Sequence, residues 1–244
     1  MQKELKLTEL DNRLKDKSIE ESLRILAAEF NGKIVFTTSF GIEDQVITYI
    51  LKLNEINIEI ATLDTGRLFP ETFKVFNETI KQYKQGISVY FPDHEEVEKM
   101  VTEKGPFSFY YSFENRIECC RIRKTEPLNR MLIGKECWVS GIRAEQSAGR
   151  NKMKQLEYDP GRNIIKYYPL FKWSLDEVIN YIRQNNIPYN ILHDRGYVSI
   201  GCEPCTRAVK PGDDFRSGRW WWEKGNGKEC GLHVYNKPEN NEDK

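Results

Sequence analysis

At 244 residues the chain is long enough for one substantial domain, or for a domain with an appended lobe. Charged residues make up 30% and hydrophobic residues 39%, which is ordinary for a globular protein in water. Lysine plus arginine and aspartate plus glutamate both number 37, so no overall field indicates a nucleic-acid or membrane partner. Any cationic site must therefore be local.

The N-terminal stretch, residues 1–23, is charged throughout. It has neither the apolar core of a signal peptide nor the acid-poor character of a transit peptide. No apolar run approaches the ~18 residues of a membrane span. These features predict a cytoplasmic location, where six cysteines suggest metal binding or catalysis more than structural disulfides.

Strand and helix patterns alternate along most of the chain. Ser18 to Phe30 predicts an amphipathic helix, with Ser18 as N-cap and Glu21 completing a capping box. Five strands are predicted, over Lys33–Thr38, Ile58–Leu63, Ile87–Phe91, Glu136–Ser140 and Ile164–Tyr168. Later helices are predicted from Ser39–Asp44 to about Leu53, Pro70 to about Tyr83, His94 to about Lys104, and Ser174 to Asn185.

This alternation predicts an α/β fold with a doubly wound, mainly parallel sheet. From about Asn190 the pattern stops, and Gly, Pro, Cys, Arg and Trp dominate. We divide the chain into an N-terminal helical segment (1–32), a nucleotide-binding α/β domain with the proposed metal site (33–215) and a C-terminal tail (216–244).

Two loops follow predicted strands, where ligands bind in such sheets. In SFGIED (39–44), a small hydroxyl and a glycine at a strand-to-helix junction can aim backbone N–H groups at an anion. In LDTGRLFPET (63–72), Asp64 and Thr65 have the groups to bind ribose hydroxyls, and Arg67 a phosphate. Each loop alone is also readable as an ordinary helix entry.

Four cysteines fall into two pairs, Cys119-Cys120 and Cys202-Glu-Pro-Cys205. Adjacent cysteines are poorly placed to bond to each other, because the planar peptide between them opposes disulfide geometry. The C-x-x-C pair alone fits a redox centre or a metal hook equally well. In a [4Fe–4S] cluster each thiolate binds its own iron, so an adjacent pair plus a C-x-x-C favours iron–sulfur over zinc.

Two cysteines remain. Cys137, in an apolar strand, is assigned to the core, and Cys230 lies in the glycine-rich stretch GNGKECG near Lys228 and His233. Such cations favour a thiolate, which makes Cys230 a candidate nucleophile, although an incidental exposed thiol fits as well. His94 and His193 look structural, and the run of three tryptophans (220–222) is expected to serve packing.

Together the motifs resemble one family, the assimilatory sulfonucleotide reductases, and within it the iron–sulfur adenylylsulfate (APS) reductases. The resemblance rests on SFGIED, LDTGRLFPET, CCRIRKTEPL, GIRAEQS, HDRGYVSIGCEPCT and RWWWE…KECGLH, in that order, and runs from about residue 33 to residue 233.

The resemblance implies an adenine-nucleotide α-hydrolase-like fold with a modified pyrophosphate loop at Ser39 to Asp44. It implies a [4Fe–4S] cluster on Cys119, Cys120, Cys202 and Cys205. Cys230 would be the nucleophile, with Lys124 between cluster and substrate and His233 near the phosphosulfate. The implied substrate-binding residues are Ser39, Gly41, Asp64, Thr65, Gly66, Arg67, Arg143, Arg216 and Arg219.

The implied activity is the reduction of APS to sulfite and AMP for sulfate assimilation and cysteine biosynthesis. It would run through a thiosulfonate on Cys230, which thioredoxin or a similar dithiol donor resolves; the oligomeric state stays open. The nearest alternative is phosphoadenylylsulfate (PAPS) reductase, whose members usually lack the cluster cysteines. An ATP-pyrophosphatase-type enzyme and a zinc-stabilised binding protein are further alternatives.

Overall fold

The computed structural model describes residues 2–84, 86–147 and 149–223. Its helices are α1 (Gln2–Leu14), α2 (Ile19–Glu29), α3 (Ile42–Leu53), α4 (Pro70–Tyr83), α5 (His94–Lys104), α6 (Phe113–Cys120), α7 (Glu126–Met131) and α8 (Leu175–Gln184). Its strands are β1 (Ile34–Thr37), β2 (Glu59–Leu63), β3 (Ser88–Tyr90), β4 (Cys137–Ser140), β5 (Leu156–Asp159) and β6 (Ile164–Tyr167). Among the described helices, none has the length and apolar character needed to cross a membrane.

The strands form one sheet in the order β3-β2-β1-β4-β6-β5. All neighbours are parallel except β5 and β6, which pair antiparallel. Strand order reverses direction between β1 and β4, so the topological switch point lies there. The predicted α/β, doubly wound, mainly parallel fold is confirmed.

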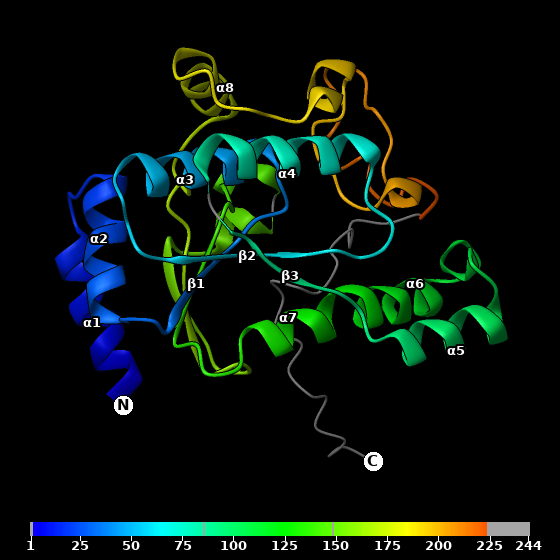
Figure 1. Ribbon diagram of the computed structural model, residues 1–244, viewed down its shortest axis with the longest axis horizontal. Helices are drawn as coiled ribbons and strands as arrows, with labels where there is room; N and C mark the ends of the chain where they lie inside the picture. The colour runs from blue at the N-terminus through cyan, green and yellow to red at the C-terminus, as the bar shows by residue number, and fades with distance from the viewer. Residues whose placement is uncertain (1, 85, 148, 224–244) are drawn as a thin grey trace.

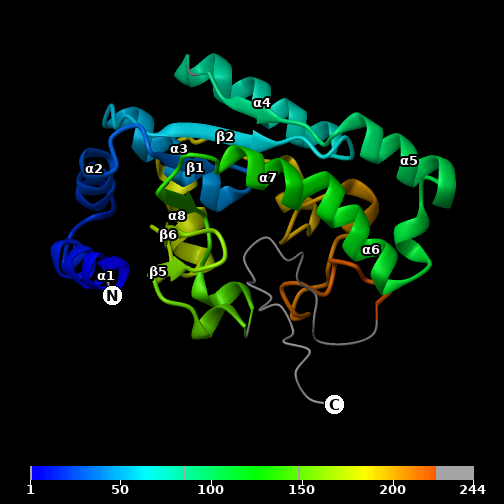
Figure 2. The same ribbon diagram turned by 90° about the horizontal axis from the view of Figure 1, so that it is seen from below.

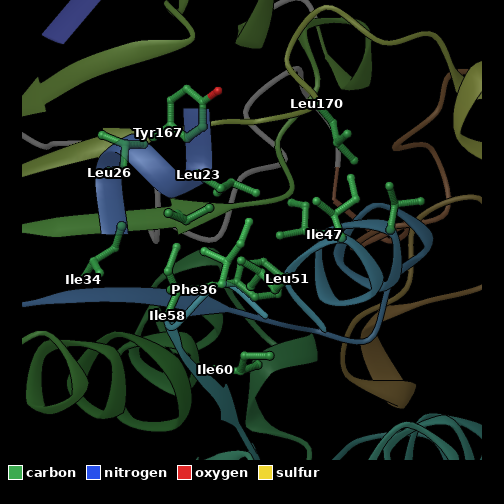
Figure 3. Close-up of a cluster of buried hydrophobic side chains, with 14 of the residues drawn as sticks. Leu23, Leu26, Ile34, Phe36, Ile47, Leu51, Ile58, Ile60, Tyr167 and Leu170 are labelled. Atoms are coloured by element: carbon green, nitrogen blue, oxygen red, sulfur yellow. The ribbon is translucent and has the colours of Figure 1, made fainter. Parts of the chain in front are cut away.

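Helices cover both faces of this sheet (Figure 1). Alternate residues of β1 explain why: Ile34 and Phe36 point to one buried cluster, and Val35 to another. The first cluster includes residues of α2, α3 and α8, and Figure 3 shows labelled side chains of α2 and α3 meeting those of β1. The second cluster is closed by Leu128 and Met131 of α7, on the opposite face.

The N-terminal helices belong to this core. Leu23 and Leu26 of α2 are fully buried in the first cluster, and Leu10 of α1 joins them. The predicted capping box of α2 is present, since Ser18 Oγ accepts from the Glu21 N–H at 3.1 Å and Glu21 Oε2 accepts from the Ser18 N–H at 2.8 Å.

Between β3 and β4 the chain leaves the sheet as α5, α6 and α7 (Figures 1 and 2). α6 runs into a π-helical segment, Arg121–Thr125, that continues directly into α7. After α8 the described chain consists of short 3₁₀ turns and loops, among them Ile191–Arg195 and Glu203–Cys205. The Ile191–Arg195 turn lies beside α4, since Arg195 Nη1 donates to Glu71 Oε1 at 3.3 Å, and the Glu203–Cys205 turn lies beside α6, since Cys205 shares a buried cluster with Cys119 and Cys120.

Candidate active site

A cavity of about 240 Å³ opens where the carboxyl ends of three parallel strands meet. Its lining includes Thr37 of β1, Thr62 of β2 and Ser140 of β4, with the Ser39–Asp44 loop above them. The 198–202 loop and the 215–219 segment close the other side. The cavity thus lies at the switch point, where sheets of this kind bind ligands.

The carboxylate of Asp44 fixes the loop between β1 and α3 through two hydrogen bonds from Ser39. Asp44 Oδ2 accepts from the Ser39 N–H at 2.6 Å and from the Ser39 hydroxyl at 2.7 Å. Phe40 adopts the left-handed backbone conformation, at φ 60°, and its buried ring stacks on Phe76 with centroids 4.6 Å apart. Gly41 then stands as N-cap of α3, and Gly41, Glu43 and Asp44 line the cavity.

Gly141, directly after β4, approaches this loop closely. A Cβ at Gly141 would overlap Asp44 Oδ1 and lie 3.0 Å from Glu43 Cβ. Only glycine therefore lets the β4 end pack against the start of α3, and the sequence analysis had not singled it out.

The loop after β2 turns toward the cysteines. Asp64 Oδ1 accepts from the Gly66 N–H at 2.8 Å, and Gly66 has φ 68°. Thr65 Oγ1 accepts from the Cys202 thiol at 3.3 Å, and the Arg67 carbonyl accepts from the Glu203 N–H at 2.8 Å. As far as the described residues define the lining of the cavity, Thr62, Leu63 and Leu68 belong to it and residues 64–67 do not.

The Arg67 side chain also points away from the cavity. Its Nη2 donates to the Pro106 carbonyl at 2.5 Å, and its guanidinium lies over the rings of Phe107 and Phe109, 5.5 and 5.4 Å from their centroids. In this conformation Arg67 links the loop to the segment that precedes α6.

The two cysteine pairs gather in one place. Cys119 and Cys120 are the last two residues of α6. Cys202 is the N-cap of the Glu203–Cys205 turn, and Cys205 is its last residue. All four cysteines are buried and pack in one cluster with Trp220, Phe109 and Met100. Cys137 is instead fully buried in the main core on β4.

The four thiols interact electrostatically with one another and with nearby cations. Burial raises the pKa of Cys119, and raises that of Cys205 to about 12. Burial also opposes ionisation of Cys202, but Lys124, the Thr65 hydrogen bond and Arg219 outweigh it, so its pKa is lowered. Among the described residues, no three His, Cys, Asp or Glu side chains are placed to hold a metal ion.

The π-helical segment brings two cations inward. Lys124 lines the cavity and is only 9% exposed, while Arg123 donates from Nη1 to the Thr65 carbonyl at 2.7 Å. In a regular α-helix the side chains of these two residues would point in other directions, because a π turn contains one residue more than an α-helical turn. No sequence pattern predicted this π-helical segment.

Arg216 and Arg219 line the cavity beside Lys124 and Cys202. The Arg219 guanidinium lies over Gly201, where a Cβ would overlap it, and over the Trp220 ring at 4.9 Å. The structure thus brings together the predicted residues Ser39, Gly41, Lys124, Cys202, Arg216 and Arg219.

Arg143 is placed differently. It is 1% exposed, its Nε donates to Glu43 Oε1 at 2.8 Å, and its Nη1 lies 3.3 Å from Glu145 Oε2. Within the described part of the chain it does not line the cavity, and its contacts brace the loop that follows β4 against α3.

The cavity residues that were not predicted from the sequence include three polar ones, Ser140, Arg150 and His193. The Ser140 hydroxyl and His193 Nε2 are buried and lack a hydrogen-bond partner among the described residues. Burial lowers the pKa of His193, which favours a neutral ring. A histidine was expected to be structural, and only the fold reveals that it reaches the cavity.

Cys230 and His233, the predicted nucleophile and its neighbour, lie outside the described residues. The last described residue, Glu223, lies beside α6, because its carboxylate binds Arg116.

Comparison with known proteins places this site in a family. Residues 33–208 match the family described as Phosphoadenosine phosphosulfate reductase domain, and this range covers the sheet, the Ser39–Asp44 and 198–202 loops and both cysteine pairs, but not the 215–219 segment. The chain belongs to this family.

Several proteins are similar in sequence to this chain over most of their own length. An adenosine 5'-phosphosulfate reductase of Neisseria meningitidis serogroup B is 51% identical over 199 residues, 81% of each chain. One from Sinorhizobium fredii strain NGR234 is 46% identical over 225 residues, 92% of this chain and 89% of the relative.

Solved structures support the same fold. A phosphoadenylyl-sulfate reductase from Candida auris, in a phosphate complex, is 27% identical, with a TM-score of 0.71 over 83% of this chain and 96% of that one. The FMN adenylyltransferase of Candida glabrata, in complex with FAD and pyrophosphate, shares the fold alone, at 16% identity and a TM-score of 0.53 over 96% of this chain and 83% of that one.

Proposed function

We propose that this protein is an assimilatory adenylylsulfate reductase that reduces APS to sulfite and AMP. The observation that carries the proposal is the placement of four buried cysteine side chains beside a cavity lined by Lys124, Arg216 and Arg219. Relatives at 45–51% identity that are named adenosine 5'-phosphosulfate reductase support it.

The donor set fits a [4Fe–4S] cluster. Soft thiolates are the ligands that iron–sulfur clusters take, and Cys119, Cys120, Cys202 and Cys205 are buried together in an otherwise apolar cluster. Lys124, Arg123 and Arg219 supply nearby positive charge. These four residues would hold the cluster, which when bound would add a fixed anionic centre beside the cavity.

The nucleotide would occupy the cavity at the switch point. The N-terminus of α3, where the N-cap Gly41 has no side chain to form a cap hydrogen bond, has N–H groups suited to an anion. Ser140 and His193 supply two buried polar atoms suited to the hydroxyls or the base of the nucleotide. In this proposal Asp64, Thr65, Gly66 and Arg67 support the same binding region from the β2 end, and Arg143 does so from behind α3.

The sulfur transfer would begin at Cys230. Its thiolate attacks the sulfate sulfur of APS, a new S–S bond forms, and the bond to the bridging phosphate oxygen breaks as AMP leaves. Negative charge grows on that oxygen, where Lys124, Arg216, Arg219 and His233 would stabilise it.

A dithiol protein, thioredoxin in our proposal, would complete the reaction. One donor thiolate attacks the Cys230 sulfur and releases sulfite, and its second thiol closes the donor disulfide and frees Cys230. The two electrons therefore come from the donor. A reducing compartment suits both this chemistry and the free cysteines, so we propose a cytoplasmic location.

Turnover assays with APS and PAPS test the substrate assignment. The purified protein, given a thioredoxin system, should release sulfite from APS with a much higher kcat/KM than from PAPS. A preference for PAPS would support the alternative suggested by the Candida auris relative. Sulfite release from neither nucleotide would reject both.

A further inference from the structure

Arg116 makes an unusual set of contacts for a charged residue. It is 0% exposed, and its guanidinium binds the Glu223 carboxylate through two bonds, Nε to Oε1 at 2.6 Å and Nη2 to Oε2 at 3.0 Å. The same guanidinium lies between two rings, 4.8 Å from the Phe113 centroid and 4.6 Å from that of Trp220. A paired, stacked arginine of this kind is held in one orientation.

This pair joins the two halves of the proposed cluster site. Arg116 precedes Cys119 and Cys120 by three and four residues on α6, so all three share one face of the helix. Trp220, on the other side, donates its backbone N–H to the Cys205 carbonyl at 3.1 Å. The pair therefore fixes residues 220–223 against both cysteine pairs.

Cys230 follows Glu223 by seven residues. A fully extended chain of seven residues spans at most about 25 Å, so the position of Glu223 limits where the Cys230 sulfur can reach. Glu223 also donates its own N–H to the Trp220 carbonyl at 2.9 Å, which closes a turn at this point.

We propose that Arg116 and Glu223 are a positioning pair: they anchor the base of the segment that carries Cys230 and so direct its thiol to the cavity. This inference rests on the proposed function, in which Cys230 accepts the sulfonate. Neither side chain contacts the reacting atoms in this account. Their effect is on how often the thiol is in place for attack.

Stability alone does not require such a pair. A buried ion pair replaced on both sides by apolar residues is often as stable as the original, whereas removal of one partner leaves an uncompensated buried charge. The double variant Arg116→Met/Glu223→Met therefore removes the anchor with the smallest expected effect on folding, and Glu223→Gln tests it with the least change in shape.

The experiment measures the single-turnover rate at which APS sulfonates reductant-free, iron-loaded protein, followed by mass spectrometry. APS affinity, iron content and the melting temperature are measured on the same samples. The matched control is Glu118→Gln. Glu118 lies on α6, as Arg116 does, and this change removes its ion pair with Lys104 of α5 (2.7 Å) without touching residues 220–223.

We expect both anchor variants to sulfonate at least about tenfold more slowly while APS affinity and iron content stay at wild-type values, because a misplaced reacting group loses rate rather than binding. The control should match the wild type. A wild-type rate in the double variant, or a slow rate that appears only together with loss of iron, would overturn the inference. Absence of any adduct on the wild type would instead reject the proposed function itself.

Discussion

The Asp44 side chain organises the loop between β1 and α3, and its surroundings make stability depend on pH. Burial raises its pKa from 3.8 to about 6, while the hydrogen bonds from Ser39 act in the opposite direction and the Glu43 charge raises it further. The folded pKa lies above the unfolded one, so folding favours the protonated carboxyl. Its stabilising contribution is complete below pH 3.8 and is lost as pH rises through about 6.

Asp44→Asn removes this titration. The free energy of unfolding of the variant, minus that of the wild type, should rise by roughly 3 kcal/mol between about pH 4 and about pH 7, at about 1.4 kcal/mol per pKa unit. Urea unfolding across this range measures the difference. The amide of the variant is a weaker acceptor for the Ser39 hydrogen bonds, which lowers its unfolding free energy by the same amount at every pH. If the variant-minus-wild-type difference instead falls as pH rises, the pKa of Asp44 is not raised by folding.

Gly141→Ala tests the close approach of the β4 end to the Ser39 loop. The added methyl would overlap Asp44 Oδ1, so the loop must shift, and we expect weaker APS binding and a stability loss of about 1–3 kcal/mol. Isothermal titration and thermal unfolding measure both. Gly86→Ala is the control, because a Cβ there meets nothing within 4 Å; equal effects at the two positions would contradict the account.

At the level of elements, the pattern of apolar residues in the sequence correctly located most of the strands and several of the helices that pack on the sheet. All five predicted strands are present within one or two residues of their predicted ends, and so are α2, α3, α4, α5 and α8. β5 was missed, although the turn sequence Asp159-Pro-Gly-Arg-Asn163 separates it from β6. The π segment was missed because one inserted residue leaves no trace in local propensity.

The same limit applies to the site. Cysteine spacing pointed to a shared centre for Cys119, Cys120, Cys202 and Cys205, and the structure gathers them. Ser140 lies in no quoted motif, and His193 opens HDRGYVSIGCEPCT without an assigned role, because what these side chains do depends on which segments meet at the cavity. Whether the cysteines hold iron stays a prediction.

Alanine substitution of the cysteines tests that prediction. Cys119→Ala and Cys202→Ala should lose iron and the broad visible absorbance of an iron–sulfur protein purified without oxygen, since each thiolate holds one corner of the cluster. Cys137→Ala, in the β4 core, should keep both. Iron analysis and absorbance spectra of the purified variants measure this loss. Colourless wild-type protein with bound zinc would favour the alternative of a zinc-stabilised binding protein.

On the scale of the whole molecule, Leu10 of α1 belongs to the core that backs the sheet. Leu23 and Leu26 of α2 lie in the same core (Figure 3). Our division of the chain at residues 32 and 215 stays a prediction of organisation. The packing nevertheless implies that segment 1–32 unfolds together with the sheet, because Leu23 and Leu26 touch the same buried cluster as Phe36.

Leu23→Ala should therefore lower the free energy of unfolding of the whole chain by about 2–5 kcal/mol, in a single transition. Leu5→Ala is the matched control, because Leu5 is 66% exposed and should change stability by less than about 0.5 kcal/mol. Denaturant unfolding followed by both circular dichroism and tryptophan fluorescence measures the effect. Two separate transitions would mean that the N-terminal helices form an independent unit.

The most direct test of the whole account is the mass of the protein after incubation with APS in the absence of any reductant. The account predicts that the wild type gains the mass of one SO3 group, and that Cys230→Ser, with its iron retained, gains none. A wild type without the adduct, or a Cys230→Ser protein that still carries it, would contradict the assignment of the sulfur acceptor.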